Sequence, residues 1–109
     1  MNEVRETAEY SDWLSTLKDT KARARILVRM KRVEAGNFGD HKSVGDGVSE
    51  LKFDFGPGYR AYYTIRGETV VFLLCGGDKD SQEQDIVSTK KRKQEQSTSE
   101  GHTTQGSGV

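Results

Sequence analysis

The chain has 109 residues, which is the size of one domain and excludes a multidomain enzyme. Its 17 basic residues balance 17 acidic ones, so net charge alone gives no reason to expect nucleic-acid binding. A single cysteine excludes an internal disulfide and is typical of a reducing compartment, and no signal peptide or membrane span is visible, so we expect a cytoplasmic protein without membrane contact.

The end of the chain differs in composition from the rest. From Lys90 to Val109 the sequence holds a Lys-Lys-Arg-Lys run and then mostly Gln, Ser, Thr and Gly, and its only large apolar side chain is the terminal valine. Such a segment cannot bury enough surface to offset chain entropy. We therefore expect residues 1–89 to form the domain and residues 90–109 to be a frayed helix end and a disordered tail.

The first third of the chain predicts a short strand and two helices. Residues 2–7 indicate a strand, and Thr7 is suited to cap the helix that follows. Asp19 and Thr20 end this helix and offer caps for a second one that reaches about Ala35. Apolar residues at helical spacing are Tyr10, Trp13, Leu14 and Leu17 in the first helix and Ala22, Ile26, Met30 and Val33 in the second.

The rest of the domain predicts three strands and a last helix. Residues 37–47 show no apolar period, so we expect a loop there. Strands are then expected at residues 50–55, 59–66 and 69–75. The last of these is apolar on both faces and belongs inside the sheet. Gly67-Glu68 suits a two-residue hairpin turn, and Ser81 with Gln84 fits a capping box that opens a final helix.

The predicted order β-α-α-β-β-β-α indicates an α+β fold with a small, mostly antiparallel, twisted sheet. The two-helix segment is long enough to cross over and return the first strand to that sheet. We expect the helices to cover one face and to leave the other open. That open face would carry Glu50, Lys52 and Arg60, and it is where we look for function.

Six blocks of sequence add a resemblance to this pattern. They are Trp13-Leu14, Arg25-Ile26-Leu27, Gly36-Asn37-Phe38-Gly39-Asp40, Gly47-Val48-Ser49-Glu50-Leu51, Phe55-Gly56-Pro57-Gly58-Tyr59-Arg60 and Leu74-Cys75-Gly76-Gly77-Asp78-Lys79. In this order the chain resembles the addiction module killer protein branch of the RelE/ParE superfamily, which is HigB-like and also called phage-derived Gp49-like. The resemblance covers roughly residues 2–90 and leaves out the tail.

The resemblance implies the toxin of a type II toxin–antitoxin system. Its partners would be a cognate antitoxin, usually a small helix-turn-helix protein, together with the ribosome and messenger RNA; no cofactor or small-molecule substrate is implied. Many members of the superfamily are ribosome-dependent endoribonucleases that promote attack of a ribose 2′-OH on the adjacent phosphate, which leaves a 2′,3′-cyclic phosphate. This chemistry needs cations around a phosphorane and groups that move two protons.

The resemblance also implies catalytic residues. Arg60 matches the arginine of the Gly-Tyr-Arg block, and guanidinium can bind two phosphate oxygens at once. Lys52 matches one of the basic residues on the preceding strand, whereas Glu50 stands where a second basic residue is expected and offers a carboxylate base instead. Lys79 is the nearest candidate for the cation expected after the last strand. The general acid is not assigned.

Further RNA contacts are predicted on the second helix and on the strand of Arg60. Lys21, Arg25, Arg29 and Arg32 share one side of the helix. This stripe is either an ordinary solvated face, a contact for ribosomal RNA phosphates, or a surface that an acidic antitoxin segment covers. Tyr62 would share a face with Arg60 and is a candidate for stacking on a base.

Other functions remain open at this stage. A ParE-like inhibitor of DNA gyrase would share the fold without the chemistry, and the acid at position 50 keeps this alternative open. A non-toxic antitoxin-binding remnant is the third alternative. In the structural interpretation of Arg60, its guanidinium simply pairs across strands with Glu50 or Asp54, a contact that contributes about 0.2–1 kcal/mol.

Cysteine and metal chemistry are not expected. Cys75 lacks a matched histidine and is predicted to be a buried small side chain. His41 and His102 are single histidines in a predicted loop and tail, so the sequence offers no ligand set for zinc.

Overall fold

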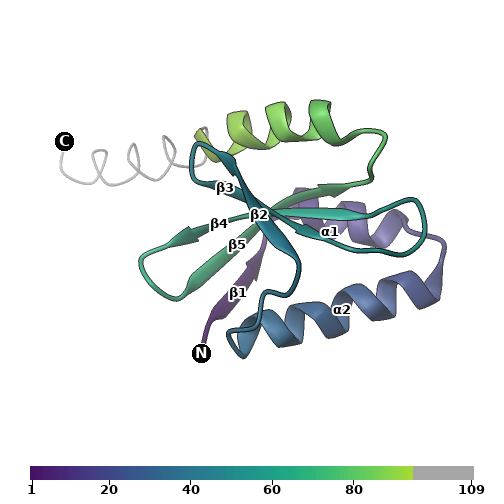
Figure 1. The fold of residues 1–109 in the computed structure, drawn as a ribbon, viewed down its shortest axis with the longest axis horizontal. Helices are drawn as coiled ribbons and strands as arrows, with labels where there is room; N and C mark the ends of the chain where they lie inside the picture. Colours follow the sequence, from purple (N-terminus) through teal and green to yellow (C-terminus); the bar gives the residue numbers. More distant parts are fainter. Residues whose placement is uncertain (95–109) are drawn as a thin grey trace.

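The computed structural model describes residues 1–94, which form a five-stranded sheet with helices on both of its faces (Figure 1). The elements are β1 (Glu3–Glu6), α1 (Ala8–Thr16), α2 (Thr20–Glu34), β2 (His41–Gly45), β3 (Val48–Lys52), β4 (Arg60–Arg66) and β5 (Val70–Gly77), followed by a C-terminal helix over residues 82–94.

The sheet has the strand order β1-β5-β4-β3-β2. β1 runs parallel to β5, and every other neighbouring pair is antiparallel. The parallel pair is possible because α1 and α2 form a crossover long enough to return the chain to the far edge of the sheet. The predicted fold class, α+β with a small and mostly antiparallel sheet, is confirmed.

The predicted caps of the first two helices are also present. The hydroxyl of Thr7 accepts a hydrogen bond from the backbone N–H of Tyr10, at 3.3 Å. One carboxylate oxygen of Asp19 accepts from the N–H groups of Lys21 and Ala22, at 3.0 and 3.2 Å. Each cap satisfies N–H groups that have no partner inside the helix, and such a cap stabilises by about 1 kcal/mol.

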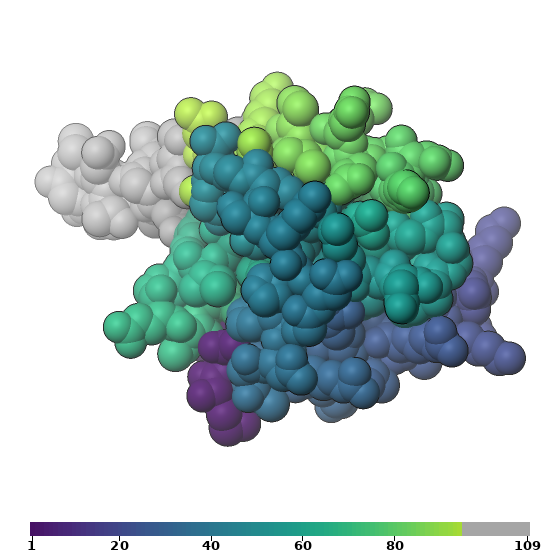
Figure 2. All heavy atoms as spheres, in the orientation of Figure 1, coloured from purple at the N-terminus to yellow at the C-terminus, as the bar shows by residue number. Residues whose placement is uncertain are grey.

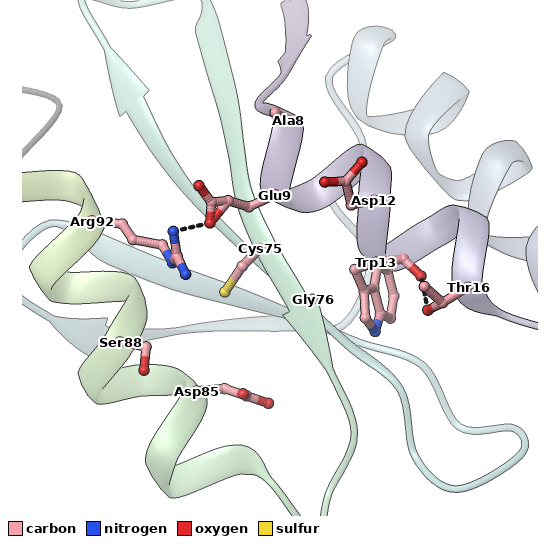
Figure 3. Close-up of a pocket in the computed structure, with 10 residues that line it drawn as sticks. All are labelled: Ala8, Glu9, Asp12, Trp13, Thr16, Cys75, Gly76, Asp85, Ser88 and Arg92. Atoms are coloured by element: carbon pink, nitrogen blue, oxygen red, sulfur yellow. Dashed lines mark hydrogen bonds and ion pairs between the residues drawn. The ribbon is translucent and has the colours of Figure 1, made fainter.

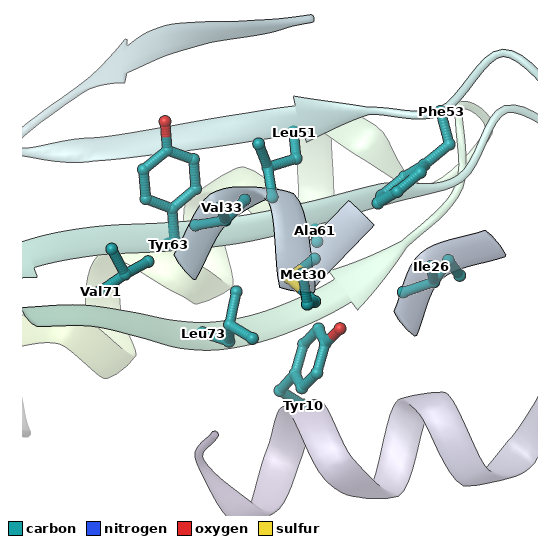
Figure 4. Close-up of a cluster of buried hydrophobic side chains, with 10 residues drawn as sticks. All are labelled: Tyr10, Ile26, Met30, Val33, Leu51, Phe53, Ala61, Tyr63, Val71 and Leu73. Atoms are coloured by element: carbon teal, nitrogen blue, oxygen red, sulfur yellow. The ribbon is translucent and has the colours of Figure 1, made fainter. Parts of the chain in front are cut away.

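The main core lies between the sheet and the first two helices (Figure 4). The predicted apolar face of α2 is buried against the strands, and each fully buried aliphatic side chain contributes about 1.5–3 kcal/mol. The buried members of this cluster are Tyr10, Ile26, Met30, Val33, Leu51, Phe53, Ala61, Tyr63, Val71 and Leu73.

The opposite face of the sheet is covered, so the prediction of an open face is wrong. The C-terminal helix lies across it, on the other side of the sheet from α2 (Figure 1). Ile86 of this helix packs against a second buried cluster of Val48, Tyr62 and Leu74. The strands therefore carry apolar side chains on both faces, and the second face gains its cover from the helix that follows β5.

β2 occupies part of the segment 37–47 that was predicted to be a loop. It pairs antiparallel with β3 through a turn in which Asp46 and Gly47 both have positive φ, +56° and +74°. An Asp-Gly pair favours this kind of hairpin, so the sequence did contain a signal. The apolar pattern is missing because β2 is an exposed edge strand, which Figure 2 shows in blue between the C-terminal helix and α2.

The hairpin between β4 and β5 is one residue longer than predicted. Arg66 and Val70 are paired partners, which leaves residues 67–69 as the turn. Gly67 has φ +62°, a conformation that suits glycine.

The cap before the C-terminal helix differs from the predicted box of Ser81 with Gln84. Asp78 and Ser81 form a reciprocal pair: the carboxylate of Asp78 accepts from the N–H of Ser81 at 3.0 Å, and the Ser81 hydroxyl accepts from the N–H of Asp78 at 3.2 Å. The same box geometry is therefore present, with its first residue three positions earlier.

The C-terminal helix continues beyond the predicted end of the domain. Lys90 forms an ion pair with Asp46 at 3.5 Å, and Arg92 forms one with Glu9 of α1. The predicted tail from residue 95 onward, with His102, lies outside the described residues. Over residues 1–94 no helix has the length and apolar character that crossing a bilayer requires.

Candidate functional site

Two of the predicted catalytic cations face each other across β3 and β4. Lys52 and Arg60 are paired partners in the register of the two strands. Like charges directly opposite each other destabilise a sheet unless an anion lies between or beside them. The Glu50 carboxylate lies beside Arg60, 3.7 Å from its Nε, whereas Lys52 has no salt bridge in residues 1–94, so an anion bound beside Lys52 would further relieve the repulsion.

Lys79 joins this pair through the loop after β5. Its backbone N–H points to the carbonyl of Pro57 at 3.4 Å. A Cβ atom on Gly58 would lie 3.3 Å from the Cβ of Lys79, and Gly58 has φ +77°. Glycine at position 58 thus allows both the turn and the close approach of the lysine.

A groove of about 510 Å³ brings the three cations together. In residues 1–94 neither Lys52 nor Lys79 forms a salt bridge. Two acids, Asp40 and Asp54, also lie in the wall, so the groove has a modest positive balance. Its lining residues are Asp40, Lys52, Phe53, Asp54, Gly56, Pro57, Gly58, Arg60 and Lys79.

Glu50 lies behind Arg60 and not in the groove. Its side chain has no exposed surface. One carboxylate oxygen lies 3.7 Å from Nε of Arg60, and the other lies 3.5 Å from Nζ of Lys42. Gln82 donates to both oxygens, at 3.0 and 3.2 Å. The structure therefore supplies the buried carboxylate with counter-charges and hydrogen bonds, as a buried charge requires.

This placement separates the four predicted catalytic residues into two groups. Arg60, Lys52 and Lys79 line one groove, whereas Glu50 has no surface on which to meet a substrate. A general base must come within hydrogen-bond reach of the proton that it takes, so the arrangement suits Glu50 to holding Arg60.

Lys42 and Gln82, the other two residues on the Glu50 carboxylate, are not predicted from the sequence. Lys42 was assigned to a loop, and Gln82 is one of several polar residues at a helix start. Neither has a local signal, because their role depends on contact with a distant strand.

Tyr62 lies two residues after Arg60 on β4 and shares its face, as predicted, and its paired partner on β3 is Glu50. Its ring is fully buried beneath the C-terminal helix, and its hydroxyl has no hydrogen-bond partner among residues 1–94. Burial, followed by the nearby Glu50 carboxylate, raises the pKa of the Tyr62 phenol. The predicted stacking on a base would require this helix to move away.

Arg29 is engaged within the fold. Its guanidinium donates to the carbonyls of Phe38, Lys52 and Asp40, at 3.0, 3.0 and 2.8 Å. Desolvation lowers the pKa of Arg29, and Asp40 partly offsets this. Because Asp40 and Lys52 line the groove, Arg29 supports one wall of it from α2.

The other two predicted RNA contacts on α2 are exposed. Arg25 lies over the ring of Phe55, 5.1 Å from its centroid, and Arg32 faces solvent. α2 covers the sheet face opposite to that of Glu50, so these two arginines do not join the Glu50 cluster.

The chain matches a known protein family. Residues 12–99 match the family described as phage-derived protein Gp49-like, over more than half of the chain. The chain belongs to this family. A protein of Haemophilus influenzae described as uncharacterized is 47% identical over 93 residues, which cover 85% of this chain and 94% of that protein. The Gp49-like resemblance is thus confirmed, and the HigB-like branch stays a prediction.

This Gp49-like chain has a second hollow, of about 450 Å³, between α1, the end of β5 and the C-terminal helix (Figure 3). Three acids and one arginine line it, and that arginine, Arg92, is paired with Glu9. A phosphate is repelled by such a wall. The full lining is Ala8, Glu9, Asp12, Trp13, Thr16, Cys75, Gly76, Asp85, Ser88 and Arg92.

Cys75 is half-buried at the base of this second hollow. Its sulfur lies 2.6 Å from the hydroxyl oxygen of Thr89, which ties β5 to the C-terminal helix. Burial raises the pKa of the Cys75 thiol, and the Thr89 hydrogen bond only partly opposes this. A thiol held protonated is a poor nucleophile, which agrees with the structural role predicted for it.

Proposed function

We propose that this Gp49-like chain is the toxin of a type II toxin–antitoxin system and cleaves messenger RNA on the ribosome. The observation that carries the proposal is the groove in which Lys79 joins the opposed cations Arg60 and Lys52. Family membership supports it, because the Gp49-like family falls within the toxin superfamily that the sequence resembles.

The groove suits a phosphodiester that is under attack by its neighbouring 2′-OH. In this reaction the 2′-oxygen forms a bond to phosphorus while the bond to the 5′-oxygen breaks. The 2′-proton leaves to a base and the 5′-oxygen takes up a proton. The phosphorane gains charge on its non-bridging oxygens, which a guanidinium fork can bind in pairs and two ammonium groups can neutralise. We assign Arg60, Lys52 and Lys79 to this electrostatic work.

The proposed partners follow from this chemistry. Messenger RNA is the substrate, and the ribosome would orient it, since the groove is too small to hold more than a short part of a strand. A cognate antitoxin, expected to be a small helix-turn-helix protein, would block the groove or its access to the ribosome. The exposed arginines Arg25 and Arg32 remain candidates for contact with ribosomal RNA or with an acidic antitoxin segment.

The experiment is induction in a translating system, with primer extension on a defined messenger RNA. We expect new 5′ ends in the wild type and a loss of about 10²–10³-fold in their rate of appearance for Arg60→Ala, because one electrostatic donor contributes about this much. Arg23→Ala, on the exposed side of α2, is the matched control and should cleave normally.

Three results would overturn the proposal. Unchanged cleavage by Arg60→Ala would separate the groove from the chemistry. Growth arrest without new 5′ ends, together with inhibition of DNA supercoiling by the purified protein, would instead establish the ParE-like alternative. Absence of growth arrest would leave the non-toxic remnant.

A further inference from the structure

The start of the C-terminal helix reaches directly into the cluster behind the groove. Gln82 is the first residue of this helix, and its side-chain nitrogen donates to both oxygens of Glu50. The reciprocal pair of Asp78 and Ser81 sets where the helix begins. Gln82 is thereby presented to a carboxylate 32 positions earlier in the chain.

Glu50 connects Gln82 to the groove. Its Oε2 atom, which accepts the shorter hydrogen bond from Gln82, also lies 3.7 Å from Nε of Arg60. Nε of Arg60 is buried and has no hydrogen-bond partner in residues 1–94, so its contact with Glu50 is an ion pair, and only 12% of the arginine side chain is exposed. Nη1 points to the carbonyl of Tyr59 at 3.5 Å. Nε of the guanidinium is thus directed at the protein, while Arg60 also lines the groove.

We propose that Gln82 is a positioning residue for the cleavage reaction. By holding the Glu50 carboxylate in place, it fixes the guanidinium of Arg60 toward the groove before a phosphate arrives. An arginine that is already oriented loses less rotamer freedom when it binds, so more of its interaction is available to the transition state. The effect of Gln82 on cleavage rests on the proposed function, whereas its effect on the orientation of Arg60 does not.

In this arrangement the C-terminal helix stays docked on the sheet during cleavage. The groove is open while Gln82 is in contact with Glu50, so substrate does not need the helix to leave. In the alternative arrangement, the helix must leave the sheet before Glu50 and Arg60 can act. The experiments below distinguish the two arrangements.

The first test compares Gln82→Leu with Gln84→Leu. Gln84 is an exposed glutamine on the same helix and is the matched control. We expect Gln82→Leu to lower kcat for RNA cleavage by about 10- to 100-fold, the loss associated with a misplaced catalytic group, and Gln84→Leu to leave it unchanged. Equal kcat values for the two variants would overturn the proposal.

A second readout needs no cleavage. Exchange of the Arg60 Nε–H with solvent, followed by NMR, should be slow in the wild type and in Gln84→Leu and at least about tenfold faster in Gln82→Leu. No change in this exchange would overturn the positioning. If the wild type fails to cleave RNA yet the exchange responds, the proposed function falls while the coupling from Gln82 to Arg60 stands.

A charge variant gives a pH signature that a merely structural role would not. Gln82→Glu places two carboxylates within hydrogen-bond distance, and such a pair shares a proton. Because two ionised carboxylates at this distance repel each other and would displace Glu50, we expect the cleavage rate of this variant, relative to that of the wild type, to be higher at acid pH than at alkaline pH. A pH profile parallel to that of the wild type would contradict the inference.

A reversible disulfide between β5 and the C-terminal helix tests whether the helix must move during cleavage. The sulfur of Cys75 lies 2.6 Å from the Thr89 hydroxyl, so Thr89→Cys places two thiols across the interface between β5 and the helix. Oxidised glutathione, by taking up their two electrons and two protons, would join them and hold the helix down. We expect the oxidised variant to cleave as it does after reduction. Loss of cleavage that reductant restores would show that the helix must open, and would overturn the proposal.

Discussion

Arg29 offers a direct measure of how firmly α2 is tied to the wall of the groove, through the variant Arg29→Met. The side chain donates to three backbone carbonyls, two of which belong to the groove residues Asp40 and Lys52. It also lies over the ring of Phe53, 5.0 Å from its centroid. Methionine keeps most of the apolar stem, so the substitution removes the hydrogen bonds and the charge while it preserves packing.

The expected loss of stability follows from these contacts. A hydrogen bond from a charged donor contributes about 1.5–3 kcal/mol when buried. Arg29 is only partly buried, so water can partly compensate for each lost hydrogen bond. We therefore assign about 1 kcal/mol of stability to each of the three. The total is about 3 kcal/mol. With an m-value of about 1–3 kcal/mol/M, the urea midpoint should fall by about 1–3 M.

The assay is equilibrium unfolding in urea, followed by the fluorescence of the single tryptophan. Arg23→Met, on the exposed side of the same helix, is the control and should change stability by less than about 0.5 kcal/mol. Arg29→Lys should recover only a part, because one ammonium group cannot reach three carbonyls with the geometry of the guanidinium. A loss of less than about 1 kcal/mol in the free energy of unfolding for Arg29→Met would refute the reasoning, since the three hydrogen bonds would then contribute no more than solvent-exposed contacts do.

Three further predictions concern single positions. Gly39→Ala should lower the free energy of unfolding in urea more than Gly36→Ala does. Both positions have positive φ, but only at Gly39 would the new Cβ lie within 2.9 Å of the Arg29 guanidinium. Equal losses of stability would mean that the Arg29 side chain can shift without an energetic cost. Burial raises the pKa of Tyr10 above its unfolded value near 10, so its contribution to stability is complete below pH 10 and is lost as pH rises further. Tyr10→Phe should therefore flatten the decline of stability above pH 10 and cost less than about 1 kcal/mol at pH 7, where the hydroxyl has no hydrogen-bond partner among the described residues; a steeper decline would contradict this. The raised pKa of Cys75 predicts slower alkylation by iodoacetamide at pH 8 than for a free thiol, with equal rates only after unfolding in urea. A rate in the native protein equal to that of the free thiol would show that the sulfur is exposed.

Much of the fold could be predicted because it depends on neighbours in sequence. The caps at Thr7 and Asp19 bond to N–H groups two or three residues away, and the buried face of α2 follows from apolar spacing. Arg60 and Lys52 could be placed on adjacent strands because only a short connection, residues 53–59 with the turn Gly56-Pro57-Gly58, separates them. The missed strand β2 carried a local signal, the pair Asp46-Gly47, which the absence of an apolar pattern outweighed.

The amino-acid sequence by itself determined the local elements other than β2, and the family resemblance that it carries pointed to the three cations that line the groove. Only the tertiary structure decided what surrounds Glu50, because Lys42, Arg60 and Gln82 come from three separate elements. The alternating pattern of β3 places the Glu50 side chain on one face of the sheet but does not say whether that face meets water or a helix. The reason is physical: local hydrogen bonds and side-chain period act over a few residues, whereas burial of a charge depends on which distant surface packs against it.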